Sequence, residues 1–232
     1  MNHDLIVALD FPDIYSAKKM VEHLGDEVSF YKIGLEFMMS GHFFDMIEWL
    51  KVKNKKIFAD LKLYDIPQTI GRAIKNLNQY NIELITIHSS SQSIMEAAVL
   101  NKRNSKIIAV TVLTSLDRID LYKMGFQQNS SISEIVENKT NLALKSGVDG
   151  IVVSGKEAYN LRSKFGDDFL IISPGIRLET IANDDQKQIC DVKTAVNNGS
   201  NFLVVGRPIT QNKNPKVAAH NFQQLIKKSL IK

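Results

Sequence analysis

Short apolar runs alternate with amphipathic segments along the whole chain. Eight runs have the β-branched and aromatic character of buried strands, at residues 5–9, 29–34, 57–62, 84–88, 106–113, 150–154, 169–173 and 202–206. Between several of them, apolar residues recur at spacings of three and four, which predicts helices at 14–24, 43–53, 69–79, 93–101 and 132–146. This alternation predicts parallel strands covered by helices.

Eight such units in 232 residues match the usual length of a (β/α)8 TIM barrel, so we predict a single α/β barrel domain over residues 1–232. A doubly wound sheet is the alternative, and the lack of a Gly-x-Gly-x-x-Gly turn after the first strand disfavours it. Two connections are longer than simple turns, 114–149 and 174–190. The first has room for an extra loop or short helix around "SLDRIDLYKMGF", and both are candidate lids.

Composition changes this picture little. Hydrophobic residues make up 44% and charged residues 23% of the chain, as in ordinary globular proteins, and no apolar run reaches the roughly 18 residues of a membrane span. The N-terminus lacks the features of a signal peptide, and Cys190 is the single cysteine. We therefore expect a cytoplasmic protein without membrane association.

The net charge of +4 does not indicate nucleic acid. The lysines are spread along the chain except in "KVKNKK" at 51–56, and no aromatic residues interleave with that patch to stack on bases. The patch is typical of a solvated helix end. A net charge of +4 suits an anionic small-molecule ligand at least as well as it suits nucleic acid.

Charged residues fall where the predicted strands end, which is where barrels build their active sites. Asp10 ends the first strand, Lys32 lies near the end of the second, and Asp60 and Lys62 end the third. Positions 60 and 62 are two apart, so their side chains should leave the same face of the strand, and neighbouring carboxylates would keep Lys62 protonated. A network that only fixes strand register is the alternative, although the desolvation cost of four charges argues against it.

Asp65 follows in the stretch "DIPQT", where it has two interpretations. It could cap the next helix, with Pro67 in the first turn, or it could belong to the site.

A second group of residues points to an anion. Arg177 and Arg207 lie in glycine-containing turns after strands seven and eight, next to Gly175 and Gly206. Many barrels bind phosphate at these loops, on backbone N–H groups and the start of a short helix. The alternative is a pair of turns with surface arginines.

The sequence gives little indication of a metal site or of a catalytic nucleophile. The five histidines lack ligand spacing, there is no His/Cys pair, and Ser154 has no visible His–Asp partner. The pattern favours a reaction without metal or cofactor, driven by a lysine between carboxylates, on a phosphorylated small molecule.

With these residues in view, the chain resembles the orotidine 5′-phosphate decarboxylase family, whose members convert orotidine 5′-monophosphate to UMP in pyrimidine nucleotide synthesis. The resemblance runs through "IVALD", "YKIGLE", "FADLKLYDIPQT", "TVLTSLD", "GVDGIVVS", "SPGIR" and "VVGRPI" in the expected order. The D-x-K-x-x-D part is shared with magnesium-dependent sugar-phosphate decarboxylases and synthases.

The resemblance implies roles for individual residues. It makes Lys62 the proton donor to C6, with Asp60 beside the departing carboxylate. It also implies a homodimer in which Asp65 and Thr69 reach the neighbouring site. The remaining implied contacts are Asp10 and Lys32 with the ribose hydroxyls, Thr114 and Ser154 with the pyrimidine, and Arg177, Gln186, Gly206 and Arg207 with the phosphate.

The sequence departs from the family pattern after strand four, where "HSSSQS" at 88–93 replaces the usual His-Ala-x-Gly-Gly. Two alternatives stay open. One is a magnesium-dependent enzyme of the same superfamily, which the "DIPQT" and "PGIR" blocks disfavour. The other is a catalytically silent phosphate-binding barrel, which the intact charges at 10, 32, 60, 62 and 65 argue against.

Overall fold

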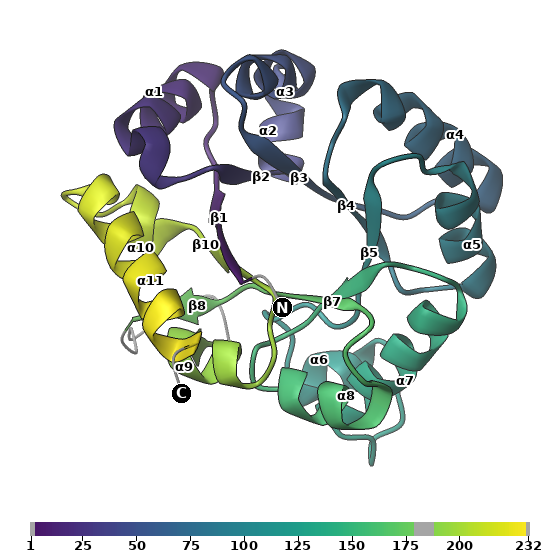
Figure 1. Ribbon diagram of the computed structural model, residues 1–232. Helices are drawn as coiled ribbons and strands as arrows, with labels where there is room; N and C mark the ends of the chain where they lie inside the picture. Colours follow the sequence, from purple (N-terminus) through teal and green to yellow (C-terminus); the bar gives the residue numbers. More distant parts are fainter. Residues whose placement is uncertain (1–2, 179–187, 231–232) are drawn as a thin grey trace.

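Eight parallel strands close into a barrel at the centre of the molecule (Figure 1). The structure is a computed structural model, and it describes residues 3–178 and 188–230. Around the barrel the strand order is β1-β10-β7-β6-β5-β4-β3-β2. The strands are β1 (Asp4–Ala8), β2 (Phe30–Gly34), β3 (Lys56–Leu63), β4 (Leu84–His88), β5 (Lys106–Val110), β6 (Gly150–Val152), β7 (Leu170–Ser173) and β10 (Phe202–Val205). The predicted (β/α)8 barrel and all eight predicted strands are confirmed.

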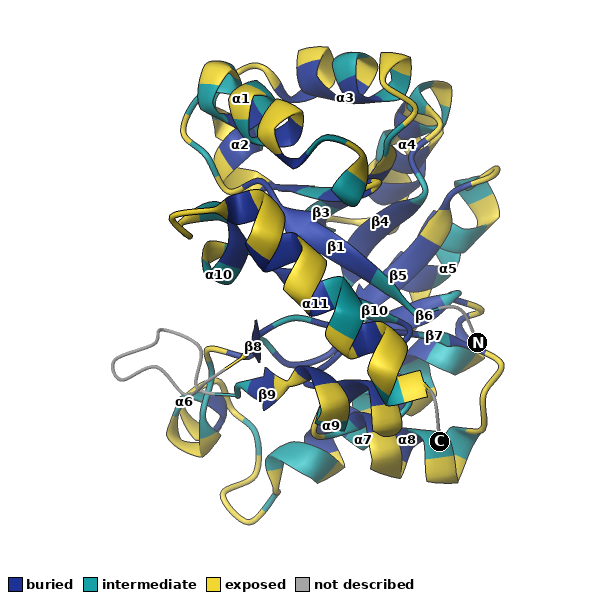
Figure 2. Cartoon of the chain, turned by 60° about the vertical axis from the view of Figure 1, so that its left-hand side comes forward, coloured by how far each residue is buried: buried dark blue, intermediate teal, exposed yellow. Residues whose placement is uncertain are grey.

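The helices surround the barrel and turn their apolar sides toward it (Figure 2). The main ones are α1 (Ile14–Leu24), α3 (Phe43–Val52), α4 (Pro67–Leu77), α5 (Gln92–Asn101), α7 (Ile132–Lys145), α8 (Ala158–Phe165), α9 (Val192–Asn197) and α11 (Pro215–Leu230). Shorter ones are α2 (Leu35–Met39), α6 (Arg118–Lys123), α10 (Arg207–Thr210) and the 3-10 turns Gly25–Glu27 and Asn78–Tyr80. Helix α6 lies between strands five and six, where the sequence predicts an extra loop or short helix. No helix of the described residues is long and apolar enough to cross a membrane.

Local sequence signals explain where several helices begin. The side chain of Asp13 accepts a hydrogen bond from Ser16 N before α1, and Ser131 and Glu134 form a reciprocal capping box before α7.

Strand β5 ends at Val110, three residues before the predicted end. Its neighbour β6 ends at Val152, the residue paired with Val110, so β5 has no strand to pair with on that side beyond this point.

The barrel interior is filled by one residue in two along each strand. Its core consists of Ile6, Ala8, Phe30, Phe58, Leu84, Ile108, Ile172 and Val204. Two positions after Phe30, Phe58 and Leu84 come three polar residues, Lys32, Asp60 and Thr86. Because side chains alternate between faces, these polar groups stand above the apolar plug at the carboxyl ends of the strands.

A repeated hydrogen-bonding device holds the opposite end of the barrel. Glu83, Asp149 and Asn201 each directly precede a strand and accept a hydrogen bond from a backbone N–H of the adjacent strand, those of Ile57, Ile107 and Ile171. Each acceptor also receives a cationic side chain, from Lys51, Lys102 and Arg162 respectively. This end of the barrel is therefore rich in charge, but its polar groups hold strands together.

We expect Asn201→Ala to destabilise the fold by about 1–3 kcal/mol. The substitution leaves the buried N–H of Ile171, now 2.8 Å from Asn201 Oδ1, without that acceptor, and it removes one contact of Arg162. Chemical denaturation of both proteins measures the difference. Asn104→Ala, at an exposed asparagine near the same end, is the control, and equal unfolding free energies for the two variants would contradict this role.

Candidate active site

A pocket of about 610 Å³ opens at the carboxyl ends of the barrel strands. Its floor is the upper part of the apolar plug, including Ala8, Phe58, Ile172 and Val204. Its charged lining residues are Asp10, Lys32, Glu36, Asp60, Lys62, Arg177 and Arg207. The structure thus brings most of the predicted site residues into one cavity.

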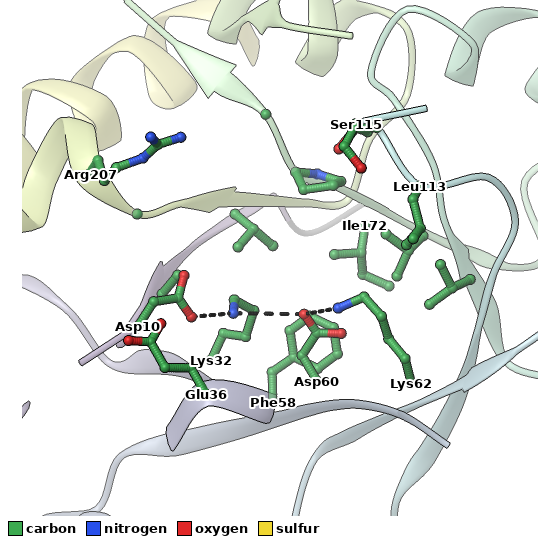
Figure 3. A pocket seen from close by; sticks show the side chains of 18 of the residues that line it. Asp10, Lys32, Glu36, Phe58, Asp60, Lys62, Leu113, Ser115, Ile172 and Arg207 are labelled. Carbon is green, nitrogen blue, oxygen red and sulfur yellow. Dashed lines mark hydrogen bonds and ion pairs between the residues drawn. The ribbon is translucent and has the colours of Figure 1, made fainter. Parts of the chain in front are cut away.

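Four of these residues form a continuous row of alternating charge (Figure 3). Lys32 Nζ lies 2.8 Å from Asp10 Oδ1 and 3.7 Å from Asp60 Oδ2, and Lys62 Nζ lies 2.8 Å from the same Asp60 oxygen. The side chains of Lys32 and Asp60 are only 12% and 13% exposed, whereas that of Lys62 is 35% exposed. Lys62 is therefore the more accessible of the two ammonium groups in the row.

Burial and pairing act against each other on the two inner charges. Burial of Asp60 would raise its pKa, but Lys32, Lys62 and a hydrogen bond from Thr86 outweigh it and hold the pKa below its usual value. Burial would likewise lower the pKa of Lys32, but Asp60 and Asp10 outweigh it and keep the pKa above its usual value. Both groups are charged in the neutral pH range.

Lys62 reaches this position through a bulge. Four residue steps along β3, from Ala59 to Leu63, match two steps along β4, and Lys62 has a φ of 48°, which is uncommon for a residue with a side chain. The simple alternation that we predicted for positions 60 and 62 is therefore interrupted, although the two side chains do meet. Strained backbone of this kind gathers at functional sites.

Thr86 on β4 fixes the bulge. Its hydroxyl accepts a hydrogen bond from Lys62 N at 2.8 Å and donates one to Asp60 Oδ1 at 3.0 Å, and the side chain is completely buried. Sequence reasoning missed this residue. The available signal was a polar residue within an apolar strand, in phase with the barrel interior.

The arginines lie at another side of the same pocket. Gly175, with a φ of 72°, makes the turn from β7 into the short strand β8 (Ile176–Arg177), so Arg177 is brought to the pocket wall and is buried. Arg207 begins α10 directly after Gly206 and is exposed at the mouth. Figure 3 shows Arg207 on the opposite side of the cavity from Lys62.

The other predicted contacts are placed less uniformly. Thr114 lines the pocket on the loop after β5. Ser154 is buried outside the lining, and its hydroxyl donates to the carbonyl oxygen of Gln188 at 3.5 Å. Gln186 lies outside the described residues.

Asp65 and Thr69 are exposed and do not line this pocket. The interpretation of Asp65 as a helix cap is wrong, because Ile66 is the capping residue of α4 and the side chain of Asp65 accepts a hydrogen bond from the adjacent Ile66 N instead of from the first turn of the helix. Pro67 occupies the first turn, as predicted.

Three further polar residues line the pocket without having been predicted, Glu36, Ser115 and Gln211. Glu36 sits in the first turn of α2 and lies beside Asp10 in Figure 3. It belongs to the "YKIGLE" block, whose position after strand two was the available signal.

Segment 88–93, where the sequence departs from the family pattern, runs from the last residue of β4 into the first turn of α5. Ser89 donates its hydroxyl to Val110 O at 2.7 Å, and its own carbonyl oxygen accepts from Lys139 Nζ at 3.0 Å. His88 packs edge-on against Tyr64, and burial, followed by the nearby Lys139 and Lys62, lowers its pKa. Within residues 3–178 and 188–230, no three His, Cys, Asp or Glu side chains gather into a metal-binding group.

Comparisons with known proteins identify the family of the chain. A sequence model described as the orotidine 5′-phosphate decarboxylase / HUMPS family matches residues 3–222. The orotidine 5′-phosphate decarboxylase of Methylococcus capsulatus is 47% identical over 224 residues, covering 96% of this chain and 91% of that protein. The enzyme of Stenotrophomonas maltophilia is 41% identical and covers 97% of this chain and 93% of that protein.

Among solved structures, the orotidine 5′-phosphate decarboxylase of Lactobacillus acidophilus superposes with a TM-score of 0.84 at 32% identity, covering 97% of this chain and 99% of that one. Fold, pocket and full-length sequence similarity lead to the same conclusion. The chain belongs to the orotidine 5′-phosphate decarboxylase / HUMPS family, and within that family to the orotidine 5′-phosphate decarboxylases.

Proposed function

We propose that the pocket decarboxylates orotidine 5′-monophosphate to UMP and CO2 by electrostatic catalysis, with Lys62 as the proton donor. The observation that carries the proposal is the Asp10, Lys32, Asp60 and Lys62 row on one side of a cavity that has Arg177 and Arg207 in its wall. A phosphate and a reactive carboxylate at opposite ends of one small molecule match this separation of charge.

Substrate orientation follows from the charges. The phosphate is placed against Gly206, Arg207 and Arg177, because guanidinium groups bind phosphate by charge-assisted hydrogen bonds. The ribose hydroxyls bind at Asp10 and Lys32, the half of the row away from Lys62. The pyrimidine then lies toward Thr114, with C6 facing Lys62.

In the chemical step, the bond between C6 and the carboxylate breaks and CO2 leaves. The electron pair stays on C6 in an orbital that the ring delocalises poorly, so a nearby positive charge is needed. The Lys62 ammonium, 2.8 Å from Asp60, supplies that charge and then donates a proton to C6. This gives UMP and a neutral Lys62 amine, which regains its proton from water.

Asp60 and Lys32 prepare Lys62 for this step. Asp60 is held as an anion by Lys32, Lys62 and Thr86, so it fixes the Lys62 ammonium and stands beside the departing carboxylate. The remote phosphate contacts contribute binding energy that is expressed in the transition state.

The same contacts favour a reaction without a metal ion. Both Asp60 oxygens already receive hydrogen bonds, one from Thr86 and one from Lys62, and Lys32 lies between Asp60 and Asp10. A divalent cation at Asp60 would be repelled by the ammonium groups of Lys32 and Lys62 on either side. The magnesium-dependent branch of the superfamily therefore fits this site less well.

Arg207→Ala should raise the KM for orotidine 5′-monophosphate by roughly 10- to 100-fold, the loss expected for a charge-assisted phosphate contact of about 1.5–3 kcal/mol. Initial rates over a range of substrate concentrations measure it. Arg103→Ala, at an exposed arginine just before β5, is the control. An unchanged KM in Arg207→Ala would remove Arg207 from the phosphate site.

We also propose that Asp65 and Thr69 complete the pocket of a second copy of the chain in a homodimer. In one copy both residues are exposed outside the pocket, at the start of α4. Tyr64 and Ile66, which flank Asp65, are 68% and 63% exposed. Exposed apolar residues next to a carboxylate fit a surface that a partner subunit covers.

A further inference from the structure

Four residues, Gln188–Asp191, form a strap that connects loops of the pocket wall without lining the pocket itself. Cys190 and Asp191 make the short strand β9, which pairs in parallel with β8, so that Cys190 lies opposite Ile176 and Asp191 opposite Arg177. Cys190 N also donates to Gly175 O at 3.1 Å. Figure 2 shows β8 and β9 side by side beyond the barrel strands. One end of the strap is thus bound to the strand that carries Arg177.

Gln188 binds the other end of the strap to two different loops. Its backbone N–H donates to Thr114 O at 3.1 Å, and its side-chain Nε2 donates to Leu116 O at 3.2 Å. Its carbonyl oxygen accepts from Ser154 Oγ at 3.5 Å. One residue therefore connects the loops that follow β5, β6 and β7.

We propose that Gln188 is a positioning residue for the decarboxylation, which fixes the pyrimidine wall of the pocket relative to its phosphate wall. The inference rests on the proposed function, because it takes Thr114 as a contact of the base and Arg177 as a contact of the phosphate. Thr114 and Arg177 belong to different loops, and the strap from Gln188 to Asp191 links them directly through hydrogen bonds.

The physical reason is that a remote phosphate helps the reaction only if its binding fixes the base at Lys62. A shift of the base by a fraction of an ångström weakens the stabilisation of the transition state by Lys62, although the phosphate contacts persist. The side chain of Gln188 is the part of the link that can be removed without changing the backbone. Arg207 and Gly206 lie on the separate loop after β10, so they are unaffected.

The test uses Gln188→Met, which keeps the length of the side chain and removes its N–H donor, and Gln188→Glu, which puts an acceptor against Leu116 O. Gln79→Met, at an exposed glutamine in the 3-10 turn after α4, is the control. For each purified protein, titration with UMP gives the number of intact sites and the Kd. Initial rates with orotidine 5′-monophosphate then give kcat per titrated site.

We expect Gln188→Met to lower kcat per site by about tenfold, as for the loss of one neutral hydrogen bond, and Gln188→Glu to lower it further. The Kd for UMP should stay within about threefold of the wild-type value in Gln188→Met. Equal kcat per site in the wild type and both Gln188 variants would overturn the inference, because a purely structural role only reduces the number of sites. An inactive wild-type protein would instead overturn the proposed function.

Discussion

Lys62→Ala should abolish decarboxylation of orotidine 5′-monophosphate while leaving UMP binding measurable. The ammonium both stabilises the charge that develops on C6 and supplies the proton, and each contribution is typically worth roughly 100-fold or more. We therefore expect a loss in kcat of about 10⁴-fold or greater. UMP has no group to lose at C6, and its phosphate and ribose contacts come from other residues, so its binding should persist.

Lys56→Ala is the matched control for this experiment. Lys56 lies on the same strand, at the opposite end of the barrel, and is about half exposed. It should retain full turnover, whereas substantial decarboxylation by a folded Lys62→Ala protein would remove Lys62 from its role. Titration with UMP confirms that the Lys62→Ala pocket is intact.

Mixed dimers should recover activity that neither parent variant has. If Asp65 completes the pocket of its partner, Asp65→Ala and Lys62→Ala are each inactive alone. A heterodimer of the two contains one complete site, with Lys62 from one subunit and Asp65 from the other, and one site that lacks both. We expect about half of the wild-type activity per heterodimer, measured after the two tagged variants are co-purified through both tags.

The control for shared sites is a mixture of two variants that fail within one subunit. Lys62→Ala and Asp60→Ala affect side chains 2.8 Å apart in a single pocket, so every site of their heterodimer remains defective. Recovery in the Lys62 and Asp65 pair alone supports sharing. Verified heterodimers without any recovery would contradict it.

The sequence predicted the architecture well because strand and helix periodicities are local properties. The eight strands, the helix 14–24 and the short helix between strands five and six all appear in the structure. The boundaries that shifted depend on neighbours, as at Val110, where β5 ends together with β6. The sequence of one strand does not show where its neighbouring strand ends, so it does not show where the pairing between them stops.

The site was predicted only in part, because some of its features depend on strand position and others on contacts between strands. Asp10, Lys32, Asp60 and Lys62 stand at strand ends, and any barrel brings such positions together. The bulge at Lys62 and the bracing hydroxyl of Thr86 were not predictable, because both depend on the register between β3 and β4. The hydrogen bonds of Gln188 in the strap were not predicted, because they join loops that are distant in sequence.

The most direct measurement is the ultraviolet-monitored loss of orotidine 5′-monophosphate with purified protein in excess EDTA. We predict rapid conversion to UMP at a rate that EDTA does not change, because the ammonium groups of Lys32 and Lys62 already flank the Asp60 carboxylate. Turnover that stops in EDTA and returns with added magnesium would contradict the proposed chemistry. A folded protein that binds UMP and converts no substrate would contradict the proposed function.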